Sequence, residues 1–245
     1  MSYAIFRGEG IKTLNELSQK GSHNGRTKER YKSNPNIRVE DSKNNIEIVN
    51  CNKYVDKFYE ITREYQKEHY DRMRNMRADR KKSFHDMVND SKSVVADEMI
   101  FTSDKDFFKN MSKEELMNWA NETMNFVYEE LGYTKEQVLH AVIHVDEKVP
   151  HLHCVVVPLV KKYDKRTGTI KYTISKRSYV KDKVHLCELQ DKYHERLTKK
   201  GFKLERGEKH TGDKHLSMGQ FKNVARYYDR QHLKVRKKLK SNIGK

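Results

Sequence analysis

The chain has few of the residues that stabilise secreted domains or cross membranes. Its 245 residues include only three cysteines, Cys51, Cys154 and Cys187, which lie far apart and form no Cys-x-x-Cys pair. An odd number of separated cysteines argues against a disulfide framework and against a thiolate zinc site, and it suits a reducing cytosol. No apolar run approaches the roughly 18 residues that a membrane helix needs, and residues 1–10 lack the features of a signal peptide. We therefore expect a cytoplasmic protein with no membrane segment.

Apolar side chains are also scarce, at 35% of the chain, while charged side chains make up another 35%. The 51 Lys and Arg residues exceed the 35 Asp and Glu residues, which gives a formal net charge of +16. Such an excess of positive charge favours a polyanionic partner, and nucleic acid is the usual one. The composition therefore predicts a modest core and a nucleic-acid-binding surface.

From residue 94 onward the hydrophobic pattern alternates between the periods of strands and helices. A capping box at Ser112 and Glu115 marks the start of the first of these helices. The order β-α-β-β-α-β is that of the ferredoxin-like motif, which places its first and third strands centrally. We expect an α+β fold with a mainly antiparallel central sheet and helices on one face. The predicted elements are strands at 94–102, 138–145, 151–160 and 202–204, and helices at 112–131 and 186–197.

An N-terminal extension precedes this core. It is predicted to hold a short strand at 3–7, a loop-rich stretch from about 8 to 52, and a helix over 55–76. We expect two parts, a first domain over 1–210 and a basic helical extension over 211–245. In the extension, i, i+4 spacing relates Arg226, Arg230, Lys234 and Lys238. That basic face is equally compatible with phosphate contacts and with a solvated helix.

Three histidines are the most informative residues. His151 and His153 are two apart on a predicted strand, so their side chains project from the same face. His144 ends the preceding strand of a tight hairpin and can face them, and the connecting loop carries Asp146 and Glu147. Three imidazoles at this spacing can hold a divalent cation and leave coordination positions open. An open site can bind substrate oxygens and act as a Lewis acid.

The ten residues from His144 to His153 resemble the HxDExxPHxH motif of the Mob/Pre (MobV-type) plasmid relaxases, a branch of the HUH endonucleases. Residues 22–26, Ser-His-Asn-Gly-Arg, resemble the HNxR motif of that family. Segments at 77–81, 102–108 and 202–207 are also similar to family segments. The resemblance covers about residues 1–210, and the family usually continues into a further C-terminal helical region, through which a homodimer could form.

This resemblance implies a metal-dependent enzyme that recognises plasmid origin-of-transfer DNA, as duplex or hairpin plus single strand at the nick. Such an enzyme cuts one strand by transesterification and stays attached to a DNA end. The family position of the nucleophile falls on His23, with Tyr3 and Tyr31 as nearby alternatives. The resemblance implies Mn²⁺ or Mg²⁺, of which three imidazoles favour Mn²⁺; histidine ligation by itself leaves Zn²⁺ open.

Further site residues follow from the two motifs and the basic segment at 72–82. Glu147 is expected to accept a proton from the nucleophile or to orient it. Arg26 and Arg77 are expected to hold the scissile phosphate through forked hydrogen bonds. A solvated helix end is nearly as good an explanation of the basic segment as a DNA-binding track. The predicted DNA-contacting residues are Asn24, Arg74, Arg80, Lys81 and Lys82.

Two other functions fit part of the sequence. A tri-histidine zinc hydrolase acting on a small molecule would explain the histidines but not the charge. A DNA-binding repressor or replication-origin protein would explain the charge and would make the histidines structural.

Overall fold

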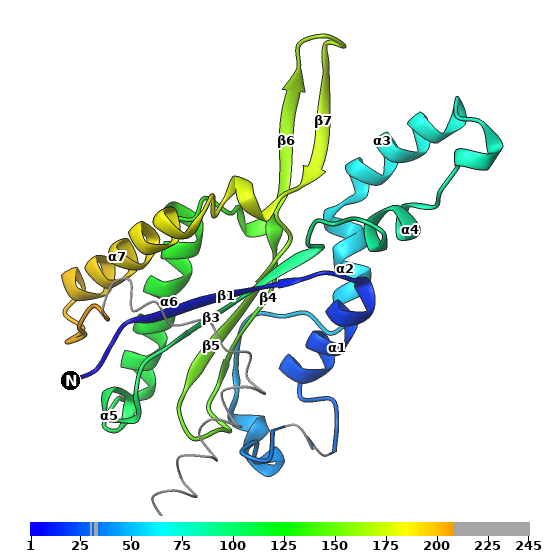
Figure 1. Cartoon of the computed structure of the whole chain (residues 1–245). Helices are drawn as coiled ribbons and strands as arrows, with labels where there is room; N and C mark the ends of the chain where they lie inside the picture. The colour runs from blue at the N-terminus through cyan, green and yellow to red at the C-terminus, as the bar shows by residue number, and fades with distance from the viewer. Residues whose placement is uncertain (30, 32–33, 208–245) are drawn as a thin grey trace, which may run out of the picture. The chain divides into compact units, whose positions relative to one another are not determined.

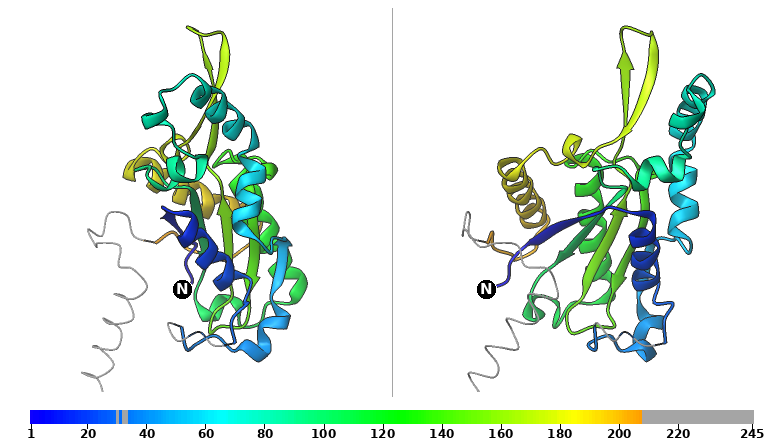
Figure 2. Two further views of the ribbon diagram at one scale, coloured as in Figure 1. Left: turned by 90° about the vertical axis from the view of Figure 1, so that its right-hand side faces the viewer. Right: turned by 45° about the vertical axis from the view of Figure 1, so that its right-hand side comes forward.

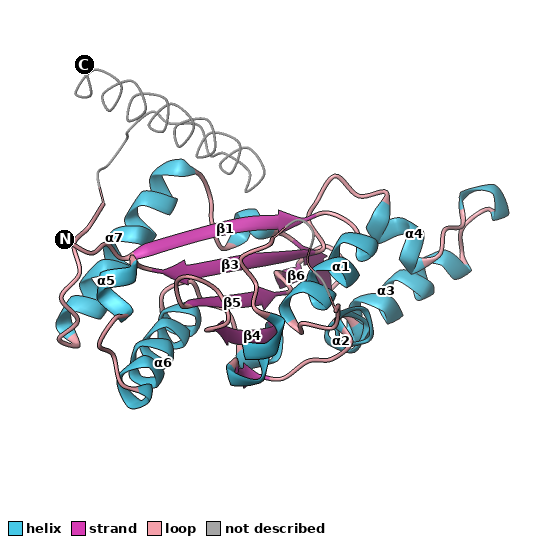
Figure 3. Ribbon diagram, turned by 90° about the horizontal axis from the view of Figure 1, so that it is seen from below, coloured by secondary structure: helices cyan, strands magenta, loops and turns pink. Residues whose placement is uncertain are grey.

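A computed structural model describes residues 1–29, 31 and 34–207 of the chain. Five of its strands form one sheet in the spatial order β1-β3-β5-β4-β2, and every neighbouring pair is antiparallel. Figure 3 shows β1, β3, β5 and β4 side by side. The five strands are β1 (Ile5–Ile11), β2 (Ile46–Val49), β3 (Ala96–Thr102), β4 (Val138–His144) and β5 (His151–Val156). The α+β class and the placement of β3 beside β5 are therefore confirmed.

The edge of the sheet next to β3 differs from the prediction. The expected strand at 202–204 is absent, and Glu205 makes only an isolated bridge with Tyr3. The N-terminal strand β1 takes that place instead, because it pairs with β3 over its whole length, from Ile5 opposite Thr102 onward. The predicted strand at 151–160 is also shorter, since Pro158 has no N–H to donate to a ladder.

The two helices predicted for the β-α-β-β-α-β core lie on one face of the sheet as expected, and helices of the N-terminal extension cover the other face. In Figure 2, α6 and α7 lie on one side and α1 and α2 on the other. The reason is that β5 is apolar on both faces: Leu152 and Cys154 join the core under α6 and α7, while Val155 joins the core under α1 and α2. The helices are α1 (Leu14–Asn24), α2 (Tyr54–Ile61), α3 (Arg63–Arg74), α4 (Phe84–Asn89), α5 (Lys105–Phe108), α6 (Lys113–Glu129) and α7 (Lys183–Lys199).

Helix α1 lies in the stretch that the sequence predicts to be loop-rich. Thr13 caps it by accepting a hydrogen bond from the backbone N–H of Glu16, and Leu17 is fully buried. Gly21 allows α1 to pack closely on α2, because a Cβ at this position would come within 2.9 Å of Tyr54. Two apolar residues and a glycine give a weak helical signal in sequence, so tertiary packing decides this helix.

Beyond one end of the five-stranded sheet lies a second, two-stranded sheet. A separate hairpin, β6 (Leu159–Asp164) and β7 (Thr169–Ile174), projects from the end where β5 finishes (Figure 1). The helix predicted over 55–76 is present but breaks at Thr62 into α2 and α3, and the capping box of Ser112 and Glu115 is confirmed at the start of α6. The predicted basic extension at 211–245 lies outside the described residues. No helix in the described ranges is long and apolar enough to cross a membrane.

Truncation of Phe126 tests the core between the sheet and α6. This fully buried ring contacts Phe6, Phe101 and Tyr193, with ring centroids 5.6, 6.2 and 5.1 Å away. We expect Phe126→Ala to lower the free energy of unfolding by about 3–5 kcal/mol, because it removes a large side chain and leaves a cavity. Urea denaturation measures this. The control is Val184→Ala on α7, which is 62% exposed and should change stability by less than about 0.5 kcal/mol; similar losses for both variants would contradict the described core.

Candidate metal centre and active site

The three predicted ligand histidines come together at one end of the sheet. His144 is the last residue of β4 and pairs directly with His151 at the start of β5, while His153 follows two residues later on the same face. Their ring centroids are 4.8–5.4 Å apart, and one nitrogen from each ring lies within 4.8 Å of the others. The pleat of two adjacent strands therefore produces the cluster that the motif spacing predicts.

Each imidazole has one nitrogen committed to an acceptor. His144 Nε2 is 2.9 Å from the carbonyl of Asn24, His151 Nδ1 is 2.9 Å from the carbonyl of Val149, and His153 Nδ1 is 2.9 Å from a carboxylate oxygen of Glu98. Because these oxygens can only accept, the three nitrogens carry protons. The opposite nitrogens, His144 Nδ1, His151 Nε2 and His153 Nε2, are left with lone pairs, as metal ligation requires.

The protonation and burial of the cluster also suit a cation. Burial lowers the pKa of His151 to about 4 and lowers the pKa of His144 as well, so both rings are neutral near pH 7. His144 Nδ1 is buried and has no hydrogen-bond partner within the described part of the chain. A buried acceptor without a partner costs free energy, and a divalent cation at this position would satisfy it. The donor set therefore fits a transition ion.

Glu98 is a site residue that the sequence analysis missed. It lies on β3, is 1% exposed, and accepts hydrogen bonds from His153 and from the Nδ2 amide of Asn24 at 2.9 Å. Burial opposes its ionisation, but the hydrogen bonds from His153 and Lys20 hold its pKa well below the usual range. The available signal was a pair of acidic residues, Asp97 and Glu98, inside a strand that is otherwise apolar.

His23 faces the cluster from the last turn of α1, and not from a flexible loop as expected. Its ring centroid is 6.3 Å from that of His144 and 6.0 Å from that of His153. Burial lowers the pKa of His23 to about 4, and the nearby positive charge of Arg26 contributes in the same direction. The imidazole is therefore neutral and has a free lone pair near pH 7.

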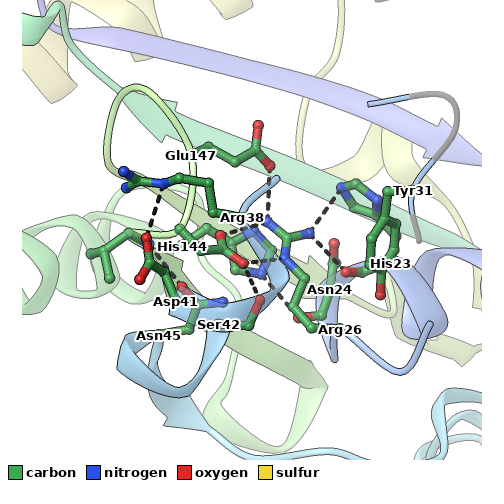
Figure 4. Close-up of polar contacts among 12 residues, drawn as sticks. His23, Asn24, Arg26, Tyr31, Arg38, Asp41, Ser42, Asn45, His144 and Glu147 are labelled. Atoms are coloured by element: carbon green, nitrogen blue, oxygen red, sulfur yellow. Dashed lines mark hydrogen bonds and ion pairs between the residues drawn. The ribbon is translucent and has the colours of Figure 1, made fainter. Parts of the chain in front are cut away.

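Arg26 joins the end of α1 to the loop between β4 and β5. Its Nε and Nη2 atoms donate to the two oxygens of Asp146 at 2.7 and 2.9 Å, and Nη2 also donates to Glu147 at 2.9 Å. Its Nη1 donates to the carbonyl of His23 at 2.9 Å and lies 3.4 Å from His23 Nε2. Figure 4 shows the guanidinium between Glu147 and His23. Most of its donors are thus engaged by Asp146, Glu147 and the carbonyl of His23.

Asp146 and Glu147 are both ionised in this arrangement. Asp146 is fully buried; burial alone would raise its pKa, but hydrogen bonds from Arg26 and from Ser42 Oγ, at 2.6 Å, hold the pKa well below the usual range. Burial also opposes the ionisation of Glu147. The nearby histidines and the guanidinium of Arg26, together with a 2.8 Å hydrogen bond from Asn34, nevertheless lower its pKa overall. The loop therefore carries two negative charges against one guanidinium.

The predicted DNA-contacting residues divide into two groups. Asn24 is 2% exposed and donates to Tyr54 and Glu98, so its side chain holds α1 against the sheet. Arg74 pairs with Asp71. The others lie on the exposed segment from α3 to α4, at the end of the sheet away from the loop between β4 and β5 (Figure 1). These residues are Arg80, Lys81 and Lys82.

Arg77 lies on the same exposed segment. Its side chain is 76% exposed and pairs with Asp79 at 3.2 Å. The structure therefore does not bring Arg77 to the histidine cluster. Of the two tyrosines considered as nucleophiles, Tyr31 packs edge-on against His23 and donates its hydroxyl to the carbonyl of Ser22.

Comparison with known proteins gives the family. A family model described as plasmid recombination enzyme matches residues 1–223. The chain belongs to this family. It is 30% identical to a plasmid recombination enzyme type 1 of Staphylococcus aureus over 254 aligned positions, which cover 99% of this chain and 56% of that protein. It is 31% identical to a plasmid recombination enzyme of a Bacillus species, over 91% of this chain and 46% of that protein. The chain thus spans about half the length of these relatives.

Solved structures agree with this placement in the plasmid recombination enzyme family. A MobM relaxase domain, crystallised with manganese and plasmid oriT DNA, superposes with a TM-score of 0.69 at 25% identity, covering 91% of this chain and 98% of that one. A second structure of that domain with oriT DNA and manganese gives a TM-score of 0.66 at 26% identity, covering 91% and 99%. The resemblance seen in the HxDExxPHxH and HNxR motifs is therefore confirmed at the level of family and fold.

Removal of the Arg26 side chain tests whether this residue holds the site together. We expect Arg26→Ala to lower the free energy of unfolding by about 3–5 kcal/mol, because the buried carboxylate of Asp146 loses its partner. Chemical denaturation at pH 7 measures the loss. The matched control is Arg38→Ala: Arg38 pairs with Asp41 but its side chain is 58% exposed, so the cost should stay below about 1 kcal/mol. An equal loss of unfolding free energy in both variants would mean that Arg26 does not hold α1 against the loop between β4 and β5.

Proposed function

We propose that this chain is a metal-dependent relaxase, which nicks one strand of plasmid DNA at an origin of transfer and remains covalently attached to a DNA end. The observation that carries this proposal is a neutral His23 facing three imidazoles whose free lone pairs converge. Membership of the plasmid recombination enzyme family supports it, as do the manganese and oriT DNA bound to the similar MobM domain. The formal charge of +16 supports a DNA substrate.

The metal would be held by His144 Nδ1, His151 Nε2 and His153 Nε2. We infer manganese, because the similar MobM domain was crystallised with it; zinc and magnesium are the alternatives to be tested. A divalent cation bound there supplies positive charge to the non-bridging oxygens of a phosphate, which lowers the cost of charge that builds up on them.

His23 acts as the nucleophile in this proposal. Arg26 can only donate, so the His23 Nε2 atom that faces it at 3.4 Å is the unprotonated nitrogen. Attack by its lone pair forms a phosphorus–nitrogen bond and breaks one phosphorus–oxygen ester bond. The departing oxygen takes up a proton from water and leaves as a hydroxyl end, while the other DNA end stays attached to the imidazole. The energy of the ester is thus conserved for religation.

Arg26 and Glu147 support this step, and Arg26 Nη1, which lies 3.4 Å from the attacking Nε2, must release that atom as the phosphate approaches. Arg26 fixes His23 through the backbone carbonyl and ties it to Asp146. Glu147 is ionised and its charge acts on the imidazole of His23, so we assign to it the proton that this imidazole loses when the new bond forms.

Replacement of one ligand tests the metal site. We expect His151→Ala to lower affinity for Mn²⁺ at least tenfold and to abolish nicking of supercoiled plasmid, while binding to DNA persists because phosphate contacts elsewhere carry most of the affinity. Calorimetric titration with Mn²⁺ and gel analysis of the plasmid give the two readouts. The control is His85→Ala, an exposed histidine on α4, which should change neither. Nicking that survives both His151→Ala and a chelator would contradict a metal-dependent relaxase. Binding of DNA by the wild type without any nicking would instead favour a DNA-binding protein with structural histidines.

Mapping of the covalent adduct tests the nucleophile. We expect His23→Ala to abolish the attachment of DNA to protein but to retain binding of Mn²⁺ and DNA, because His23 supplies neither. A labelled oligonucleotide trapped on the wild-type chain, digested and analysed by mass spectrometry, should modify the peptide that contains His23 through an acid-labile bond. Tyr31→Phe is the control and should form the adduct normally. Recovery of the adduct on Tyr31 or Tyr3, or full nicking by His23→Ala, would show that another residue attacks.

A further inference from the structure

The hairpin of β6 and β7 has no part in the site described above. It forms a two-stranded sheet of its own and points away from the five-stranded sheet in both Figure 1 and Figure 2. Its base follows directly after the end of β5, whereas the histidine cluster lies at the beginning of β5. Six residues of strand separate the two regions, which corresponds to about 20 Å.

The base of the hairpin is firmly attached to the domain. Ile174 is buried in the core under α1 and α2, and the carbonyl of Leu159 accepts hydrogen bonds from Gln137 Nε2 at 2.6 Å and from the hydroxyl of Tyr179 at 2.9 Å. Glu68 of α3 accepts the backbone N–H of Tyr172 at 2.8 Å. A hairpin held in this way projects as an oriented ribbon.

The tip is also ordered. Gly168 has a φ of +65°, which a residue with a side chain rarely adopts, and its N–H donates to the carbonyl of Asp164 at 2.9 Å. The backbone N–H of Arg166 donates to the carboxylate of Asp164 at 2.9 Å. Asp164 is the only acid of the hairpin, so this turn uses it to shape the tip.

The hairpin carries an unbalanced positive charge. Its five basic residues face one acid, and only Lys171 has a salt bridge, at 3.8 Å to Glu68. The remaining four have no salt bridge to any residue in ranges 1–29, 31 and 34–207, and all four are exposed. These residues are Lys161, Lys162, Lys165 and Arg166.

One face of the ribbon exposes large apolar side chains beside these cations. Tyr163 and Ile170 are directly opposite one another in the ladder, and they are 67% and 54% exposed. Lys161 lies two residues from Tyr163 on the same strand, so it shares this face. Exposed apolar residues set among cations fit a partner that offers both phosphates and base edges.

We propose that the β6–β7 hairpin is a β-ribbon that enters the major groove of duplex DNA, with Tyr163 and Ile170 against base edges and the lysines against phosphates. The inference rests on the proposed function, since it assigns a second DNA-binding element to the same enzyme. A major groove about 12 Å wide admits a two-stranded ribbon. The hairpin then contributes affinity and sequence discrimination for a duplex region, and takes no part in the chemistry about 20 Å away.

The salt dependence of duplex binding tests the charged half of the proposal. For Lys161→Ala with Lys165→Ala, the slope of log K against log salt on a short mixed-sequence duplex should become shallower by about 2, because two phosphate contacts are lost. The matched control is Lys105→Ala with Lys109→Ala, two exposed lysines near α5 without salt bridges to described residues, which should leave the slope unchanged. Equal slopes for the hairpin variant and the wild type, or equal changes in both variants, would overturn the proposal.

The apolar half is tested by sequence selection. Wild-type protein and the variant Tyr163→Ser with Ile170→Ser are each used to select duplexes from a randomised pool. The variant should lose tenfold or more of the preference for the selected duplex over the pool, while its salt slope stays that of the wild type. Both residues are exposed, so folding should be unaffected, which circular dichroism checks. An undiminished preference would overturn base contacts by this ribbon.

Cleavage of a short single-stranded oligonucleotide that carries the nick sequence separates this inference from the proposed function. Such a substrate is cut at the histidine cluster without reaching the hairpin. Both hairpin variants should cut it in the presence of Mn²⁺ as the wild type does. If the wild type itself cuts no DNA, the relaxase proposal fails, while the salt slopes and the selection still decide whether the hairpin binds duplex.

Discussion

The ion pair of Arg26 with Asp146 is the contact on which the arrangement of the site depends. It joins two segments 120 residues apart, the end of α1 and the loop between the ligand-bearing strands. Two parallel hydrogen bonds, from Nε and Nη2 of Arg26 to the two carboxylate oxygens of Asp146, fix both the orientation of the guanidinium and its distance from the carboxylate. Arg26 adopts a φ of 51°, which is uncommon for a residue other than glycine, and the surrounding bonds stabilise this conformation. Through the carbonyl of His23, the same side chain fixes the residue that faces the histidine cluster.

A second buried layer determines the state of the imidazoles. Glu98 receives a hydrogen bond from His153 and one from Asn24, and the carbonyl of Asn24 accepts one from His144. One asparagine thus connects two of the three ligand histidines, and it is adjacent to His23 in the chain. The layer selects which nitrogen of each ring faces the other two rings. In metal sites such partners contribute to affinity nearly as directly as the ligands do.

The sequence predicts the parts of this structure that follow from local periodicity. The strands that carry the histidines, the capped helix α6 and the order of the central strands are read directly from spacing, and the two motifs identify the family. Contacts that depend on tertiary structure are missed. Helix α1 has too few apolar residues to be recognised without Tyr54 packed against it, and the covering of both sheet faces depends on helices from the N-terminal extension. The contacts of Arg26 with Asp146 and Glu147 could not be predicted for a similar reason, since a forked guanidinium suits a buried carboxylate as well as a phosphate.

The packing of α1 has a consequence for how the site forms and comes apart. The cluster of His144, His151 and His153 is local to one hairpin, whereas His23 arrives on a helix that the rest of the chain must hold in place. Local opening of α1, by release of Gly21 from Tyr54 and of Arg26 from Asp146, would leave the three imidazoles together and remove His23 from them. During synthesis, α1 leaves the ribosome before the strands that carry the three histidines. It can dock against their loop only after β4 and β5 have emerged. A chain that is incomplete at β5 therefore has neither the histidine cluster nor His23 beside it.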